Sequence, residues 1–226
     1  MGDSLLHQAY PTIEDRLSRI GVGATIIGGP SETLMTRQAT WLDDLERSVT
    51  EYDPDVVILE SCCGTGNPWL PDPYVDADGT ELEPDSAAIW AEWERLALAY
   101  TEAAQRRGAL VLWILGPAAN TNGYYGPIED RIGVVNRIYT RVAACSGSVG
   151  LVDWGVVGGT DQDYVEALPD ANGKLIRLRA DDGLHFTEPG QALLADLTRA
   201  AVEEAWAGRT DSPTPPCVAA TSDLAE

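Results

Sequence analysis

The sequence predicts an α/β protein in which helices cover both faces of a parallel sheet, a three-layer α/β/α sandwich. Short apolar runs rich in β-branched residues alternate along the chain with longer segments of helical apolar spacing. Nearly uninterrupted apolar runs are typical of strands that are buried on both faces of a sheet. The 226 residues, 44% of them hydrophobic, are enough to bury the core of one such domain.

The first elements follow from periodicity and from turn residues. Apolar spacing predicts a helix over Ile13 to Ile20, and the β-branched run Val22 to Ile27 predicts a strand that ends at the turn Gly28-Gly29-Pro30. An amphipathic helix is expected over Trp41 to Tyr52, followed by a buried strand over Asp55 to Leu59. This order is typical of β/α units that build a parallel sheet.

The same alternation continues through the middle of the chain. A long helix is predicted over Ser86 to Arg107, and a buried strand over Leu110 to Leu115 ends at Gly116-Pro117. A further helix over Ile128 to Ala144 leads to a short strand over Gly150 to Asp153. In parallel sheets of this kind, we expect the chemistry to gather at the carboxyl ends of the strands.

The chain closes with one more helix and a polar segment. Thr187 can cap a helix over Glu188 to Ala207, and Pro189 falls in its first turn, where no N–H is required. The segment after residue 207 is Pro-rich and polar, so we expect one domain over residues 1–207 and a disordered tail over 208–226.

Composition excludes several classes of partner. Lys and Arg number 15 against 36 Asp and Glu, a formal net charge of -21, so the surface repels phosphate backbones and nucleic acid is not expected as a partner. No apolar stretch approaches the length of a membrane span. The four cysteines form no C-x-x-C clip, which disfavours a zinc site. Cys62 or Cys63 either pairs with Cys145 or stays a free thiol, and the sequence leaves both open.

Two histidines limit the choice of an imidazole base. His7 lies three residues after Ser4 and is expected at the surface or the rim of a pocket, whereas His185 stands in Asp181-Asp182-Gly183-Leu184-His185, just before the capped final helix. A tight turn there would place the Asp182 carboxylate against the imidazole, where it fixes the tautomer and stabilises the imidazolium. A surface or capping role is the alternative for a lone histidine in a loop.

Ser4, in Gly2-Asp3-Ser4-Leu5, favours the catalytic interpretation. A serine hydroxyl is a poor nucleophile unless a base lies within hydrogen-bond reach, so Ser4 needs a partner from elsewhere in the chain. His185, separated from it by a full set of β/α units, is the plausible partner. Each of these two short motifs alone is a weak signal of a catalytic site. Their occurrence in this order along one chain is a more specific signal.

These two motifs resemble those of the SGNH hydrolases, also called GDSL-like lipases and esterases. Gly2-Asp3-Ser4-Leu5 matches the opening nucleophile block of that family, and Asp182-Gly183-Leu184-His185-Phe186 matches its closing block. The resemblance covers nearly all of residues 1–207 and implies the three-layer, flavodoxin-like sandwich. It implies Ser4 as nucleophile, His185 as general base and Asp182 as the residue that orients the histidine.

The middle blocks of the family are matched less closely. Gly28 resembles the glycine whose N–H helps to form the oxyanion hole, together with the N–H of Ser4; a simple turn, or Gly29 in its place, is the alternative. Asn67 resembles the asparagine that supplies another oxyanion donor, although this chain lacks the compact G-x-N-D of the family. A turn residue is the alternative for Asn67.

The family also places a buried strand directly before its nucleophile block, and here nothing precedes Met1-Gly2. The missing strand would leave its neighbours without ladder partners. We therefore expect a start further upstream, which could include a signal peptide or an anchor, and the sequence as given predicts no localisation.

The resemblance implies hydrolysis of short acyl or acetyl esters, often on carbohydrate, through an acyl-enzyme and without a metal or organic cofactor. Trp69 and Tyr74 in one long loop, and Tyr124 and Tyr125 in the loop from Asn120 to Gly126, are candidates to line a sugar or acyl pocket, because both loops lie beyond strand ends. Two alternatives stay open: an O-acyltransferase domain that modifies a glycan, and a non-catalytic module on the same scaffold.

Overall fold

The centre of the molecule is a parallel sheet of three strands. The computed structural model describes residues 1–30, 32–35, 38–62, 74–155 and 164–208. Strands β1 (Val56–Leu59), β2 (Leu110–Leu115) and β3 (Val149–Asp153) lie in the order β1-β2-β3. Their register places Val57 opposite Val111, and Val111 in turn opposite Val149.

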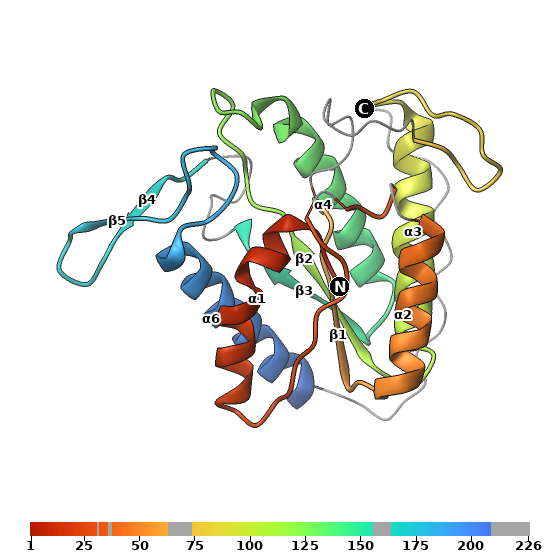
Figure 1. Cartoon of the computed structure of the whole chain (residues 1–226), viewed down its shortest axis with the longest axis horizontal. Coiled ribbons are helices and arrows are strands. Elements are labelled where there is room, and N and C mark those ends of the chain that lie inside the picture. The colour runs from red at the N-terminus through yellow and green to blue at the C-terminus, as the bar shows by residue number, and fades with distance from the viewer. Residues whose placement is uncertain (31, 36–37, 63–73, 156–163, 209–226) are drawn as a thin grey trace.

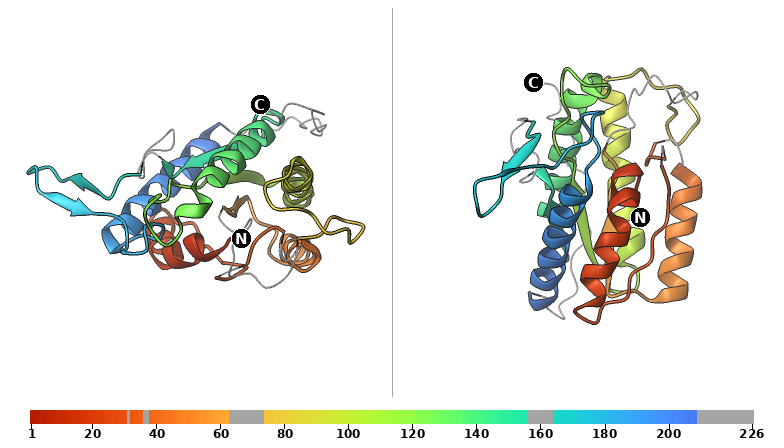
Figure 2. Two further views of the ribbon diagram at one scale, coloured as in Figure 1. Left: turned by 90° about the horizontal axis from the view of Figure 1, so that it is seen from above. Right: turned by 60° about the vertical axis from the view of Figure 1, so that its left-hand side comes forward.

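Helices cover both faces of this sheet (Figure 1). Helices α2 (Gln38–Tyr52), α3 (Ala87–Gln105) and α4 (Glu129–Ala144) pack in series on one face, with the 3₁₀ turn η1 (Gly126–Ile128) leading into α4. Helices α1 (Ser4–Ser18) and α6 (Glu188–Ala207) lie side by side on the other face, as both views of Figure 2 show. The expected three-layer α/β/α sandwich is therefore confirmed.

Strand β2 supplies side chains to both hydrophobic layers. Val111 and Trp113 point into the core shared with α2, α3 and α4, whereas Leu112 and Ile114 point into the core shared with α1 and α6. Trp113 stacks on Tyr139 of α4 with ring centroids 4.2 Å apart. Alternate side chains point to opposite faces of a strand, so a strand buried on both faces is apolar throughout.

Most expected helices and strands are present, with small shifts at their ends. Ser86 caps α3 and Thr187 caps α6, as their side chains accept hydrogen bonds from the N–H groups of Ile89 and Gly190. The first helix begins much earlier than its apolar spacing suggests, because Asp3 caps it at Ser4. Ser4 is therefore the first residue of a helix.

The strand expected over Val22 to Ile27 is absent, and this prediction was wrong. A strand needs a ladder partner, but the neighbouring Met1-Gly2 segment gives this stretch one backbone hydrogen bond, from Gly2 N to Ile27 O at 3.1 Å. The carbonyl of Ala24 accepts instead from the Tyr10 hydroxyl, at 3.1 Å. The segment has no regular secondary structure and does not join the sheet.

A two-stranded hairpin was not expected. Strands β4 (Ala167–Pro169) and β5 (Leu175–Arg177) pair antiparallel and project from the body of the molecule (Figure 1). Each has three residues, and Leu175 is 68% exposed, so the hairpin lacks the buried alternation that reveals a strand in sequence.

The structure also bears on the cysteine pairing, the C-terminal tail and the length of the helices. Cys145 is free and exposed, so it does not pair with Cys62 or Cys63. The predicted disordered tail lies outside the described residues from residue 209 onward. Within the described part of the chain, every helix is too short or too polar to span a membrane.

Candidate active site

The N-terminus of α1 presents Ser4 at the carboxyl end of β1. The Asp3 carboxylate accepts hydrogen bonds from the N–H of Leu5, at 2.9 Å, and from the N–H of Cys62, at 3.1 Å. Because Cys62 follows β1 closely in the chain, Asp3 ties the start of the helix to the end of this strand. Ser4 is thus held at the sheet edge where chemistry is expected in this class of fold.

His185 stands in a turn that Asp182 organises. One oxygen of Asp182 accepts from the N–H groups of Leu184, at 2.9 Å, and His185, at 3.0 Å. Gly183 has a φ of +79°, and a Cβ on it would lie 2.7 Å from the Cβ of Asn120, so the turn requires glycine at this position. The turn brings the Asp182 carboxylate beside the imidazole, as its sequence suggests.

The three side chains form a continuous chain of hydrogen bonds. His185 Nδ1 lies 2.7 Å from Asp182 Oδ2, and His185 Nε2 lies 2.9 Å from Ser4 Oγ. The His185 and Asp182 side chains are 18% and 33% exposed, so a substrate can reach the site while much of its surroundings is protein. This arrangement can take a proton from the serine and hold the resulting imidazolium against a carboxylate.

Asp182 is ionised at neutral pH. Burial alone raises the pKa of this carboxyl, but the hydrogen bonds from the Leu184 N–H and from His185 lower the pKa below its ordinary value. A negative charge therefore faces the Nδ1 edge of the imidazole. That charge favours the tautomer in which Nδ1 carries the proton and Nε2 can accept one from Ser4.

An aromatic loop borders the histidine. The Tyr125 ring lies edge-on to His185, with centroids 5.6 Å apart, and Tyr124 lies edge-on to Tyr125 at 5.0 Å. Asn120 N donates to Gly183 O at 2.9 Å, which fastens this loop to the histidine turn. Tyr124 is 57% exposed, and it offers an aromatic surface to a ligand near the site.

Two glycines allow the close approach of backbones beneath Ser4. A Cβ on Gly2 would lie 2.7 Å from the Cβ of Leu6 and 2.9 Å from a Glu60 carboxyl oxygen. Gly28 has a φ of +99°, and a Cβ there would lie 2.5 Å from the Gly2 carbonyl oxygen. A Cβ on Gly29 would meet only a Glu32 oxygen, at 3.9 Å, so Gly28 and not Gly29 packs against the nucleophile turn.

The N–H groups in the first turn of α1 have different partners. The Leu5 N–H donates to Asp3, and the Leu6 N–H faces the Glu60 carboxyl group. The N–H of Ser4 has no acceptor within the helix, because the first N–H groups of any α-helix lack one. The same end of the helix carries a partial positive charge. Ser4 N–H is therefore suited to bind an oxyanion next to the Ser4 hydroxyl.

The other residues considered from sequence have different outcomes. Asn67 and Trp69 lie outside the described residues, so their suggested roles stay predictions. Tyr74 is buried at 6% exposure, so the expectation that its ring lines a ligand pocket was wrong. His7 is exposed on α1, in agreement with the surface position expected for it. His185 is the histidine that contacts Ser4.

Sequence reasoning gave no role to Glu60, although this residue is 2% exposed and contacts Asp3. A usable signal was present, since a carboxyl group directly follows the apolar run Val56–Leu59 at the catalytic edge of the sheet.

Comparison with known proteins identifies the family and the fold. The family model described as "Protein of unknown function (DUF459)" matches residues 1–201. No curated protein matches the chain.

Solved structures resemble the chain over nearly its whole length. A lipase/acylhydrolase from Enterococcus faecalis is 18% identical, covers 96% of each chain and has a TM-score of 0.56. A carbohydrate esterase of family 3 from Talaromyces cellulolyticus is 11% identical and covers 93% of this chain and 97% of its own, with a TM-score of 0.59. The C-terminal catalytic domain of peptidoglycan O-acetyltransferase A from Streptococcus pneumoniae is 15% identical, covers 94% and 93%, and has a TM-score of 0.53.

Other matched structures carry the names GDSL-like lipase and SGNH hydrolase. At such identities the likeness shows a shared fold. With the family model matched over residues 1–201, the chain belongs to the DUF459 family, and its fold is that of the SGNH hydrolases.

Proposed function

We propose that this chain is a serine esterase that hydrolyses short acyl or acetyl esters through an acyl-enzyme. The observation that carries the proposal is the hydrogen-bonded series from Ser4 Oγ through His185 to Asp182, with distances of 2.9 and 2.7 Å. A hydroxyl, an imidazole and a carboxylate in this order are the components of nucleophilic acyl transfer.

In the first half of the reaction, Ser4 Oγ bonds to the acyl carbon while His185 Nε2 takes the hydroxyl proton. The tetrahedral intermediate collapses as its bond to the alkoxy oxygen breaks, and His185 gives the proton to the departing alcohol. Asp182 stabilises the imidazolium between these two transfers. The product is an acyl ester on Ser4.

Water completes the reaction. His185 takes a proton from a water molecule, whose oxygen attacks the acyl carbon, and the second intermediate collapses to the free acid and the restored Ser4 hydroxyl. We assign the stabilisation of both oxyanions to the N–H groups of Ser4 and Gly28, with Asn67 as a further candidate. The contact of Gly28 with the Gly2 backbone supports this assignment.

A carbohydrate ester is the substrate class that we favour. The Tyr125 ring lies beside His185 and the exposed Tyr124 ring lies beside Tyr125, and exposed aromatic rings suit the apolar faces of sugars. The structural similarity to a carbohydrate esterase and to an acetyl xylan esterase agrees with this choice. The acyl group is expected to be short.

Transfer of the acyl group to a sugar hydroxyl is the second candidate, favoured by the fold shared with a peptidoglycan O-acetyltransferase domain. The same acyl-enzyme serves both reactions, and the acceptor alone differs. Product analysis with and without an added glycan acceptor distinguishes them, since a transferase forms a new sugar ester and a hydrolase forms only free acid.

Labelling with an alkyl fluorophosphonate tests the proposal. The activated hydroxyl should displace fluoride, and mass spectrometry of digested protein should locate the phosphonyl group on Ser4. A well-folded protein that takes no label, or takes it on another residue, would contradict an active nucleophile at Ser4 and favour a non-catalytic module.

A further inference from the structure

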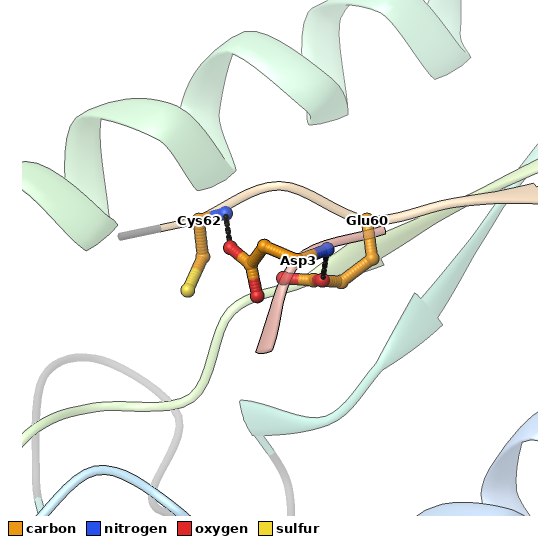
Figure 3. A group of neighbouring side chains, drawn as sticks. All are labelled: Asp3, Glu60 and Cys62. Carbon is orange, nitrogen blue, oxygen red and sulfur yellow. Dashed lines mark hydrogen bonds between the residues drawn. The ribbon is translucent and has the colours of Figure 1, made fainter. Parts of the chain in front are cut away.

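Two buried carboxyl groups meet beneath the nucleophile. Asp3 is 4% exposed and Glu60 is 2% exposed, and the Asp3 N–H donates to Glu60 Oε2 at 2.9 Å. Figure 3 shows the Asp3 carboxylate lying between the backbone N–H of Cys62 and the Glu60 side chain. Two negative charges at such proximity and burial would repel each other strongly, so the pair should hold a proton.

The hydrogen bonds indicate which carboxyl group holds it. Both Asp3 oxygens accept backbone N–H groups, from Leu5 and from Cys62. The Oε2 of Glu60 likewise accepts from Asp3, but its Oε1 is buried and accepts no hydrogen bond from the described residues. A proton on Glu60 Oε1 would give this oxygen a role as donor, since Asp3 is the acceptor beside it.

We propose that Glu60 is a protonated carboxylic acid at neutral pH that donates a hydrogen bond to the Asp3 carboxylate and so positions Ser4. It acts through Asp3, which caps α1, and through the Leu6 N–H in the first turn of the same helix. Both contacts fix the end of the helix that carries the Ser4 hydroxyl and N–H. The inference rests on the proposed function, because positioning matters only if Ser4 reacts.

The charges around Glu60 favour its neutral form. Burial, and then the nearby Asp3, raise the pKa of the Glu60 carboxyl well above its usual range. Among the described residues, the Tyr139 hydroxyl also faces it, and burial raises the pKa of this hydroxyl. At neutral pH the hydroxyl is uncharged and does not balance a Glu60 carboxylate.

A bound metal ion is the other arrangement to consider. Asp3, Glu60 and Cys62 lie close enough together to hold one. The Cys62 sulfur is in a disulfide, however, and is not a thiolate ligand. The oxygens of Asp3 are already directed at backbone N–H groups. A shared proton accounts for these contacts with no further group.

Glu60→Gln is the decisive variant. Its amide oxygen can accept from Asp3 and Leu6 while its NH₂ group donates to the Asp3 carboxylate, so the variant keeps the geometry but carries no titrating proton. Glu60→Met removes the donor at similar volume. Glu51→Gln, at an exposed carboxyl of α2, is the control for loss of one negative charge.

The first measurement is the free energy of unfolding against pH, which does not depend on activity. If the pKa of Glu60 is higher in the folded than in the unfolded protein, the protonated Glu60 stabilises the folded state at low pH. This stabilisation is lost as the pH rises toward the folded-state pKa. Relative to Glu60→Gln, the unfolding equilibrium constant of the wild type should therefore rise about tenfold for each pH unit above about 4.3. Parallel curves for these two proteins would overturn the proposal. The curves of wild type and Glu51→Gln should run parallel.

The second measurement is the rate of fluorophosphonate labelling at Ser4. Glu60→Gln should restore most of the rate that Glu60→Met loses, a loss of about 10- to 100-fold for a hydrogen bond to a charged group. Equal damage by both variants, or none by Glu60→Met, would overturn the positioning role. If Glu60→Met does not fold, the pH dependence of Glu60→Gln still decides. If the wild-type protein is not labelled at Ser4, the proposed esterase function is contradicted, whatever the pH dependence of the unfolding free energy.

Discussion

The Ser4 hydroxyl oxygen lies 2.9 Å from His185 Nε2, although 181 positions separate the two residues in the chain. Helix α1 presents the serine at its first residue, and the turn before α6 presents the histidine. Because α1 and α6 pack side by side on one face of the sheet, the two ends of the domain meet at one site (Figure 2).

Ser4→Ala should abolish hydrolysis of a short-chain aryl ester and leave the fold intact, because it removes the nucleophile and little packing. Initial rates and circular dichroism of the purified variant measure both effects. Ser18→Ala, at the exposed far end of the same helix, is the control and should behave as wild type. Undiminished activity in Ser4→Ala would end the assignment.

Replacement of the base and of its partner should have unequal effects. His185→Ala should lower kcat/KM by about 10³-fold or more, because it removes the general base. Asp182→Asn leaves a misoriented imidazole and should retain weak activity. Asp181→Asn is the control, since its side chain is 91% exposed and pairs with Arg177 at 2.6 Å. Equal damage from the two aspartate variants would contradict the assignment of Asp182.

The stability of the protein should decline in acid partly through Asp182. Its lowered pKa means that its contribution is present above the unfolded value, about 3.9, and is lost as pH falls through the lower folded pKa. Asp182→Asn should therefore show a shallower loss of unfolding free energy below about pH 4. Urea titrations across this range measure it, and identical slopes for variant and wild type would contradict the ionised Asp182.

Gly28→Ala should impair the enzyme more than Gly29→Ala. The backbone at position 28 has a positive φ, and a Cβ there would lie 2.5 Å from the Gly2 carbonyl oxygen. A Cβ at position 29 would meet no atom closer than 3.9 Å. We expect a fall in kcat of about 10²-fold for Gly28→Ala, the usual cost of a lost oxyanion donor. Steady-state kinetics of both variants measure it. Equal activities would contradict a role for Gly28 near the oxyanion.

Tyr124→Ala should weaken the binding of sugar esters. Loss of an aromatic contact of about 0.5 to 1.5 kcal/mol would raise KM about 2- to 10-fold for an acetylated oligosaccharide. Tyr124→Phe should retain most of the affinity, and the effect on a small aryl acetate should be smaller. Tyr52→Ala, at a similarly exposed tyrosine on α2, is the control. An unchanged KM for the sugar ester would argue against a contact between Tyr124 and the sugar.

The segments that the sequence describes well are those with a local signal. Strand β2 is apolar at every position, and α6 has Thr187 as its cap and a proline in its first turn, so both were expected where they lie. Ser4, Asp182 and His185 could be named because their short motifs specify a residue type and a turn. The Asp182 turn closes within four residues and needs no distant partner to be recognised.

Other features depend on residues far apart in the chain. Val22 to Ile27 has the composition of a strand, but a strand forms only where a neighbour completes its ladder. The role of Glu60 was hidden because a lone glutamate after an apolar run shows nothing of Asp3, which lies 57 positions away and shares its buried space.

The sequence by itself therefore determined the alternation of helices and strands and the three residues of the proposed relay. Only the tertiary structure decided that Asp3 and Glu60 meet beneath Ser4 and that Gly28 packs on the Gly2 carbonyl. The physical reason is that caps, turns and periodicity act between near neighbours in the chain. The proximity of buried charges and backbones instead depends on how the helices pack against the sheet.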